Sequence, residues 1–167
     1  MQFDLSKEKL SFEYGLTLKS FKNYQKAFKE LTKEHEKAKK DLDKLCANAN
    51  VFKNDYSLES IKLLEDRYFS LCKNQGFKAL KISKERFEEL MFYYVCESAV
   101  NSTSDCKWCA KEYKIMPHRY EFGICRGFIH YFKKPKDYER SQKYTLYNEI
   151  TEFCSRVVGT DFDFILD

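Results

Sequence analysis

Two cysteines separated by two residues, Cys106 and Cys109, form the pair in this sequence best suited to metal or redox chemistry. A CxxC pair allows two sulfur atoms to converge on one zinc ion, and histidine is the other common zinc ligand. His118, Cys125 and His130 follow closely in the chain. These five residues are therefore the candidate ligands of a zinc site.

The second half of such a site does not close well if residues 117–132 are helical. Cys125 and His130 would then point about 140° apart, because a helix has 3.6 residues per turn. His118 and Cys125 would share a face but lie about 10 Å apart along the helix axis. We therefore expect no cofactor, and zinc held by these side chains is the alternative.

The same CxxC pair also permits thiol chemistry. A helix N-terminus lowers the pKa of a cysteine, and thiol oxidoreductases use this effect. The thioredoxin fold needs alternating strands and helices, which we do not expect here. A helical, flavin-linked thiol oxidase would avoid that objection, but nothing else in the sequence indicates a flavin site. No GxxxxGK[ST], GxGxxG, GxSxG or HExxH motif occurs, so we predict that the protein is not an enzyme.

The stretch 107–143 is the most basic in the chain, with 10 Lys and Arg against 4 Asp and Glu, and aromatic residues lie between the cations. Cations hold phosphates and aromatic rings stack on bases, so one interpretation is a nucleic-acid surface. The other interpretation is that the rings are buried and the cations are solvated. The candidate binding residues are Lys107, Trp108, Lys111, Lys114, Arg119, Arg126, Lys133, Lys134 and Lys136.

A long helix is predicted over 20–48, because apolar or small residues recur there with heptad spacing. This seam predicts packing against another helix, either from the same chain or from a second copy. It consists of Phe21, Tyr24, Phe28, Leu31, His35, Ala38, Leu42 and Leu45. His35 could be a register-setting or pH-sensitive contact. We favour the other interpretation, in which it faces solvent at the frayed end of an intramolecular hairpin.

The remaining elements are also expected to be mainly helical. Ser57 and Ser83 are in position to cap two further helices. Shorter helices are expected over 106–115 and 117–132, the second of them central and apolar nearly all round, and a last one over 137–158. Alternating residues at 10–18, and again near 160–167, predict strands. The predicted fold is therefore mostly α: an antiparallel bundle of five or six helices, to which the N- and C-terminal segments could add a small β-sheet.

Composition supports one helical domain over 1–167, with 1–18 as a strand or hairpin appendage and 57–158 as the helical core. Five Gly and two Pro are too few for an all-β chain. No apolar run approaches a membrane span, and the N-terminus lacks the pattern of a signal peptide. The seven cysteines are therefore expected to be reduced thiols or metal ligands in the cytoplasm.

These features favour a non-enzymatic intracellular binding protein that acts by protein–protein contact. A regulator or inhibitor that occludes its partner would fit, and so would a phage or mobile element as its source. Self-association through 20–48 is an additional expectation, and no membrane contact is expected. The first alternative is a nucleic-acid-binding module, stabilised by zinc or not. The second alternative is a CxxC thiol enzyme.

Overall fold

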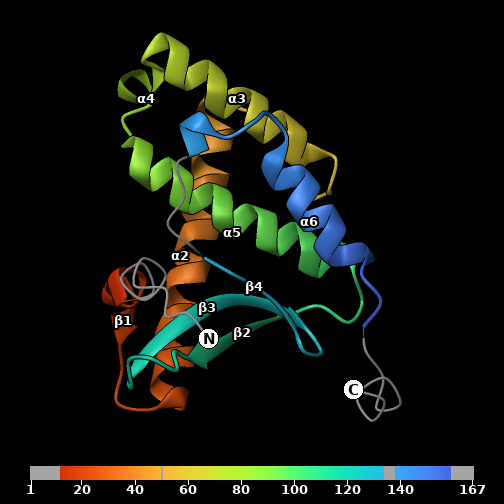
Figure 1. The fold of residues 1–167 in the computed structure, drawn as a ribbon. Helices are drawn as coiled ribbons and strands as arrows, with labels where there is room; N and C mark the ends of the chain where they lie inside the picture. The colour runs from red at the N-terminus through yellow and green to blue at the C-terminus, as the bar shows by residue number, and fades with distance from the viewer. Residues whose placement is uncertain (1–11, 50, 134–137, 159–167) are drawn as a thin grey trace, which may run out of the picture.

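The computed structural model describes residues 12–49, 51–133 and 138–158, in which helices pack against a four-stranded antiparallel sheet (Figure 1). A short helical segment at 12–16 precedes the labelled elements. In chain order these are β1 (Lys19–Ser20), α2 (Tyr24–Ala49), α3 (Ser60–Asn74), α4 (Gly76–Ala79), α5 (Lys84–Ser102), β2 (Lys107–Glu112), β3 (Arg119–Arg126), β4 (Ile129–Phe132), a 3-10 turn (Tyr138–Arg140) and α6 (Thr145–Ser155).

The prediction of a mostly α-helical bundle was wrong, because the fold is mixed α/β. The stretches 106–115 and 117–132, expected to be helices, contain the three long strands of the sheet. A run that is apolar on both stripes of a helix is equally typical of a strand buried on both faces. β3 is such a strand, and its last five residues are all buried. A tight turn at Gly127, whose φ is +59°, then reverses the chain into β4.

The small sheet was predicted to form from strands in the N- and C-terminal segments, and the structure differs from this prediction. Part of the predicted strand at 10–18 is helical, and only Lys19 and Ser20 pair with β3. The other predicted strand, near 160–167, lies outside the described residues, as do residues 1–11.

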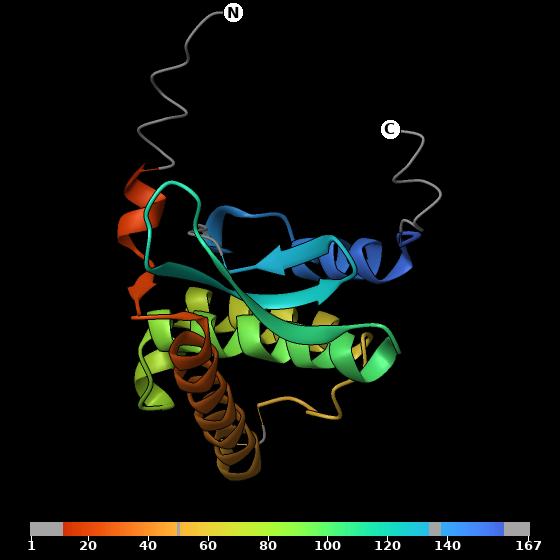
Figure 2. The same cartoon turned by 90° about the horizontal axis from the view of Figure 1, so that it is seen from below.

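β3 is the central strand of the sheet. β2 pairs along one of its edges, from Lys107 opposite Cys125 to Glu112 opposite Tyr120. β1 and β4 pair with opposite ends of its other edge. One face of the sheet turns toward α5 and α2, as seen from below in Figure 2, and it presents Trp108, Ala110, Phe122, Ile124 and Tyr131 to the core.

Helix α5 is the centre of the core, a place that the sequence had assigned to 117–132. Its buried side chains run almost all round the helix from Phe87 to Ala99. Ser83 caps it as predicted, because its hydroxyl accepts a hydrogen bond from the amide of Arg86 at 3.0 Å. The seam of α2 packs on this helix and on β2, with Leu31 and Leu42 buried. Leu31, Ala38 and Leu42 of the seam are therefore covered by the chain's own elements, whereas Tyr24 near the start of the helix is 46% exposed.

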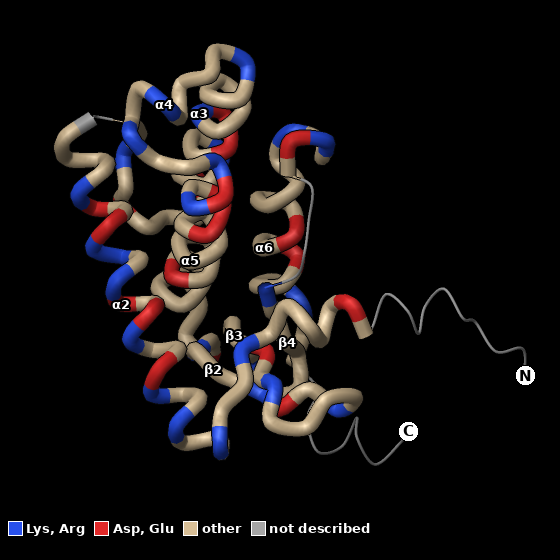
Figure 3. Tube along the Cα trace, turned by 90° about the vertical axis from the view of Figure 1, so that its left-hand side faces the viewer, with Lys and Arg blue, Asp and Glu red and all other residues tan. Residues whose placement is uncertain are grey.

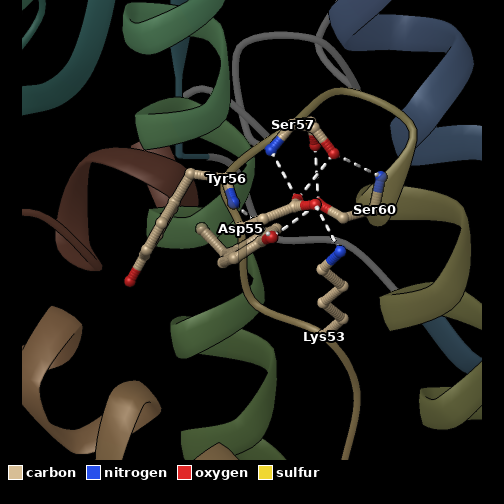
Figure 4. A network of polar contacts seen from close by, with 6 residues as sticks. Lys53, Asp55, Tyr56, Ser57 and Ser60 are labelled. Carbon is tan, nitrogen blue, oxygen red and sulfur yellow. Dashed lines mark hydrogen bonds and ion pairs between the residues drawn. The ribbon is translucent and has the colours of Figure 1, made fainter.

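A polar network orders the segment that leads into α3 (Figure 4). The Asp55 carboxylate accepts hydrogen bonds from the amide of Ser57 at 3.0 Å and from its hydroxyl at 2.6 Å. The Ser57 hydroxyl accepts from the amide of Ser60 at 3.2 Å, so Ser57 holds the start of the helix. The Ser60 hydroxyl contacts the Tyr94 hydroxyl at 2.5 Å, which ties this start to α5.

Within the part of the chain that the structure describes, no helix combines the length and the apolar character needed to cross a bilayer.

Candidate functional site: a lysine-rimmed pocket between helices and sheet

A pocket of about 310 Å³ lies where α2, α5 and β3 meet the segment around β1. This volume is at the lower end of the range of small-ligand sites, which is about 300–1,000 Å³. The pocket residues are Thr17, Leu18, Lys19, Leu31, Glu34, Phe92, Tyr93, Tyr120, Phe122 and Lys133.

The floor of the pocket is apolar and largely aromatic. Leu31 comes from the seam of α2, whereas Phe92 and Tyr93 come from α5. Tyr120 and Phe122 alternate along β3, so both rings point to the same side of the sheet. An apolar group that enters the pocket would thus meet a rigid helix–sheet junction rather than a loop.

Charged groups stand at the rim. The ammonium of Lys19 pairs with the carboxylate of Glu34 across the mouth. Lys133 is exposed, and the described residues offer it no carboxylate partner. Burial and the nearby Glu34 carboxylate raise the pKa of Tyr93, so its hydroxyl stays neutral. Within the described ranges, the pocket therefore combines an apolar floor with one positive charge that has no carboxylate partner.

A second polar cluster lies beside the pocket, between α2, α5 and β2. The Glu97 carboxylate accepts a hydrogen bond from the Trp108 indole at 2.9 Å, and His35 Nε2 lies 3.1 Å from the same carboxylate oxygen. Lys39 Nζ lies 3.6 Å from the other oxygen. His35, and after it Trp108 and Lys39, lower the pKa of Glu97 to about 2 although burial opposes this.

This cluster fixes the places of two residues that the sequence had singled out. The side chain of His35 is only 13% exposed, so it does not face solvent at the end of a hairpin. Trp108 packs against the ring of Phe122 with 5.3 Å between centroids and against His35 with 4.0 Å. Its ring is partly buried and packs against the core.

The candidate metal ligands lie in three places. Cys109 and Cys125 share the sheet face opposite to α5, and His130 stands opposite Cys125 on β4. Cys106 is buried just before β2, and His118 lies in the turn before β3 with its Nδ1 3.2 Å from the Lys22 carbonyl. Among the described residues, no three His, Cys, Asp or Glu side chains gather as a metal site would need. Zinc binding remains an untested prediction.

The thiols of the CxxC pair lie in an environment that keeps them protonated. Cys109 is on a strand, so no helix N-terminus stabilises its thiolate. Burial raises the pKa of Cys106 to about 12 and raises that of Cys109 as well. Thiol enzymes need the opposite shift.

The predicted basic surface is divided by the fold. Lys107 and Lys111 are exposed on β2, and Lys114 is exposed in the following turn. Arg119 donates a hydrogen bond to the Leu18 carbonyl at 2.5 Å. Arg126 is buried, where it pairs with Asp105 at 2.9 Å and bonds the carbonyls of Phe153 and Arg156. Lys133 stands at the pocket, whereas Lys134 and Lys136 lie outside the described residues.

Sequence reasoning missed most of the pocket, because only Lys133 among its residues had been a candidate binding residue. Leu31 had been placed on the heptad seam, but as a packing residue. No local motif marks the others, since they come from segments far apart in the chain. Only the sheet, which the sequence analysis did not foresee, brings Tyr120 and Phe122 next to α5.

A protein-family model with the description "Uncharacterised protein YwmA" matches residues 20–153. The match runs from just before α2 into α6, and it includes the pocket residues from Leu31 to Lys133. No curated protein and no solved structure matches the chain.

Proposed function

The chain belongs to the YwmA family, and from that premise we propose that it is a non-enzymatic binding protein that holds a protein partner at its lysine-rimmed pocket. The partner inserts one aromatic or long aliphatic side chain between α2, α5 and β3. The proposal places the protein in the cytoplasm, as a regulator or inhibitor that occludes what it binds.

The observation that carries this proposal is the apolar pocket itself. Leu31, Phe92 and Phe122 form a floor that offers a guest side chain contacts on several sides. Fully burying one large apolar side chain contributes about 1.5–3 kcal/mol. Anchors of this kind, seated in a desolvated pocket, supply most of the affinity of many protein interfaces.

The surroundings of the pocket favour an acidic protein as the guest. Lys133 at the rim attracts a carboxylate and raises the rate of encounter with a negatively charged surface. Leu16, which directly precedes the pocket residue Thr17 in the chain, is 54% exposed. A protein partner with a broad surface can cover such an exposed apolar side chain, whereas a small molecule would fill only the pocket.

Fewer observations support the alternative function, a nucleic-acid-binding module. Three of its candidate residues, Trp108, Arg119 and Arg126, are engaged by other parts of the protein. Exposed Lys107, Lys111 and Lys114 are also compatible with a solvated surface.

The proposal is tested by capture of partners from host cells with the full chain and with two variants. Thr17→Trp places a large ring at the mouth of the pocket, and Lys114→Glu alters an exposed charge in the turn after β2. We expect the parent protein and Lys114→Glu to capture the same acidic protein and Thr17→Trp to lose it. A partner that binds Thr17→Trp as well as the parent protein would show that the pocket is not the contact site.

A further inference from the structure

Two cysteines on neighbouring strands form a cluster that the pocket does not use. In the register of the sheet, Cys109 stands opposite Gly123, and Cys125 stands opposite Lys107. Residues two apart on a strand point to the same face, so the two cysteines are diagonal neighbours on one face. The residue directly across from Cys109 is a glycine, so no side chain on β3 separates the two sulfur atoms. After burial, the neighbouring Cys125 thiol is the next cause that raises the pKa of Cys109.

We propose that Cys109 and Cys125 form a cross-strand dithiol, which a low-molecular-weight disulfide such as oxidised glutathione converts into an intramolecular disulfide. This site is independent of the proposed partner pocket. It goes beyond a structural role for the two thiols, because it assigns them a reversible covalent modification.

The two thiols differ in access, and this difference sets the order of the steps. Cys109 is half-buried, whereas Cys125 is 6% exposed. The Cys109 thiolate attacks a sulfur of the oxidised glutathione, a mixed disulfide forms on Cys109, and one glutathione leaves as its thiolate. Cys125 then loses its proton to solvent, and its thiolate attacks Cys109 Sγ and expels the second glutathione. Overall two protein thiols are oxidised and one disulfide is reduced to two thiols.

The position on the sheet makes closure of this bond feasible. β2 pairs only with β3 among the described strands, so it can shift toward its neighbour without breaking a second ladder. Diagonal neighbours on an antiparallel pair lie about 7–8 Å apart, and a disulfide needs Cα atoms about 4.4–6.8 Å apart, so closure requires a small movement of β2 toward β3. Burial raises the pKa of Cys109, so the first step is slow at neutral pH and accelerates as the pH rises.

The test uses the full chain, oxidised glutathione and mass spectrometry of tryptic peptides. Trypsin releases Cys109 in WCAK (108–111) and Cys125 in YEFGICR (120–126), and each peptide contains one cysteine. Cys106 lies in a different peptide, 87–107, and Cys154 in another, 144–156. A peptide that links WCAK to YEFGICR therefore reports the proposed bond without ambiguity.

We expect the linked peptide to be the main product in monomeric protein. It should form about tenfold faster at pH 8 than at pH 7, because the thiolate fraction of Cys109 rises tenfold per pH unit below its pKa. Cys125→Ser should stop the reaction at glutathione bound to WCAK, whereas the matched variant Cys106→Ser should still give the linked peptide. A wild-type product that retains glutathione on WCAK, or that links peptide 87–107 to 144–156 instead, would overturn the proposal.

Discussion

At the scale of single residues, Glu65 shows how a distant side chain replaces a local helix cap. Helix α6 begins after Tyr144, which offers no side-chain cap. The Glu65 carboxylate on α3 instead accepts hydrogen bonds from the amides of Leu146 at 3.0 Å and Tyr147 at 3.2 Å, and Glu65 is only 2% exposed. A negative charge at a helix N-terminus is also favoured by the helix dipole.

Glu65→Gln should therefore destabilise the protein although it preserves the shape of the side chain. The amide group of Gln has one acceptor oxygen and an NH2 that would face a backbone donor, so about 1–3 kcal/mol of unfolding free energy should be lost. Urea unfolding measures this change. Glu152→Gln, an exposed position of the same helix, is the matched control and should cost less than about 0.5 kcal/mol. Equal losses for the two variants would contradict this account.

The Glu97 cluster predicts a specific acid sensitivity. The pKa of Glu97 is lowered to about 2 in the folded protein from 4.5. The cluster therefore contributes stability above about pH 4.5, and this contribution is lost as the pH falls toward 2. Each unit by which the pKa differs between the folded and unfolded chains corresponds to about 1.4 kcal/mol of unfolding free energy. Glu97→Gln removes this titration, so its unfolding free energy should fall less steeply between pH 5 and pH 2 than that of the parent protein. Parallel pH profiles would rule out the proposed contribution of Glu97.

At the scale of elements, Gly123 on β3 lies close to the backbone of β4. A Cβ atom added there would lie 2.0 Å from the Tyr131 carbonyl oxygen and 2.9 Å from Phe132 Cα, both backbone atoms. Neither can move without disturbing the pairing of β3 with β4.

Gly123→Ala should thus destabilise the fold by about 3 kcal/mol or more. Gly15→Ala is the matched comparison, because its added Cβ would meet the Met116 sulfur at 2.7 Å, and that side chain is flexible. We expect thermal unfolding to show a much smaller loss for Gly15→Ala. A larger stability loss for Gly15→Ala than for Gly123→Ala would mean that the β3–β4 contact does not limit stability.

Some elements could be predicted from the sequence and others could not. Heptad spacing in α2 and the cap at Ser83 depend on neighbours in the chain, and both predicted helices were found. The sheet was missed because a short, doubly buried strand and a buried helix have similar apolar patterns. His35 was predicted to face solvent, and Trp108 could have been either buried or part of a binding surface. Neither place could be predicted, because both side chains contact Glu97 on α5, which is distant from His35 in the chain and belongs to a different element from Trp108. The pocket could not be predicted at all, since its residues come from five separate segments of the chain.

At the scale of the whole molecule, the surface of α2 argues against self-association through its seam. Leu31, Ala38 and Leu42 are buried against the chain's own α5 and β2. Lys, Asp and Glu residues follow one another along the rest of the helix (Figure 3).

Sedimentation equilibrium should therefore find a monomer over the micromolar range, and Leu42→Ala should destabilise this monomer by about 2–5 kcal/mol rather than dissociate an oligomer. A stable dimer that Leu42→Ala converts into folded monomers would show that the seam also joins two copies.

The most direct test of the central claim is calorimetric titration of the captured partner into matched charge variants. If the pocket holds the partner, Lys133→Glu should weaken binding at least tenfold at low salt, because it places a carboxylate at the rim where the partner's own carboxylates approach. Lys114→Glu, with the same change in net charge away from the pocket, should change the affinity less than about threefold. Equal affinity for the two variants would contradict the account.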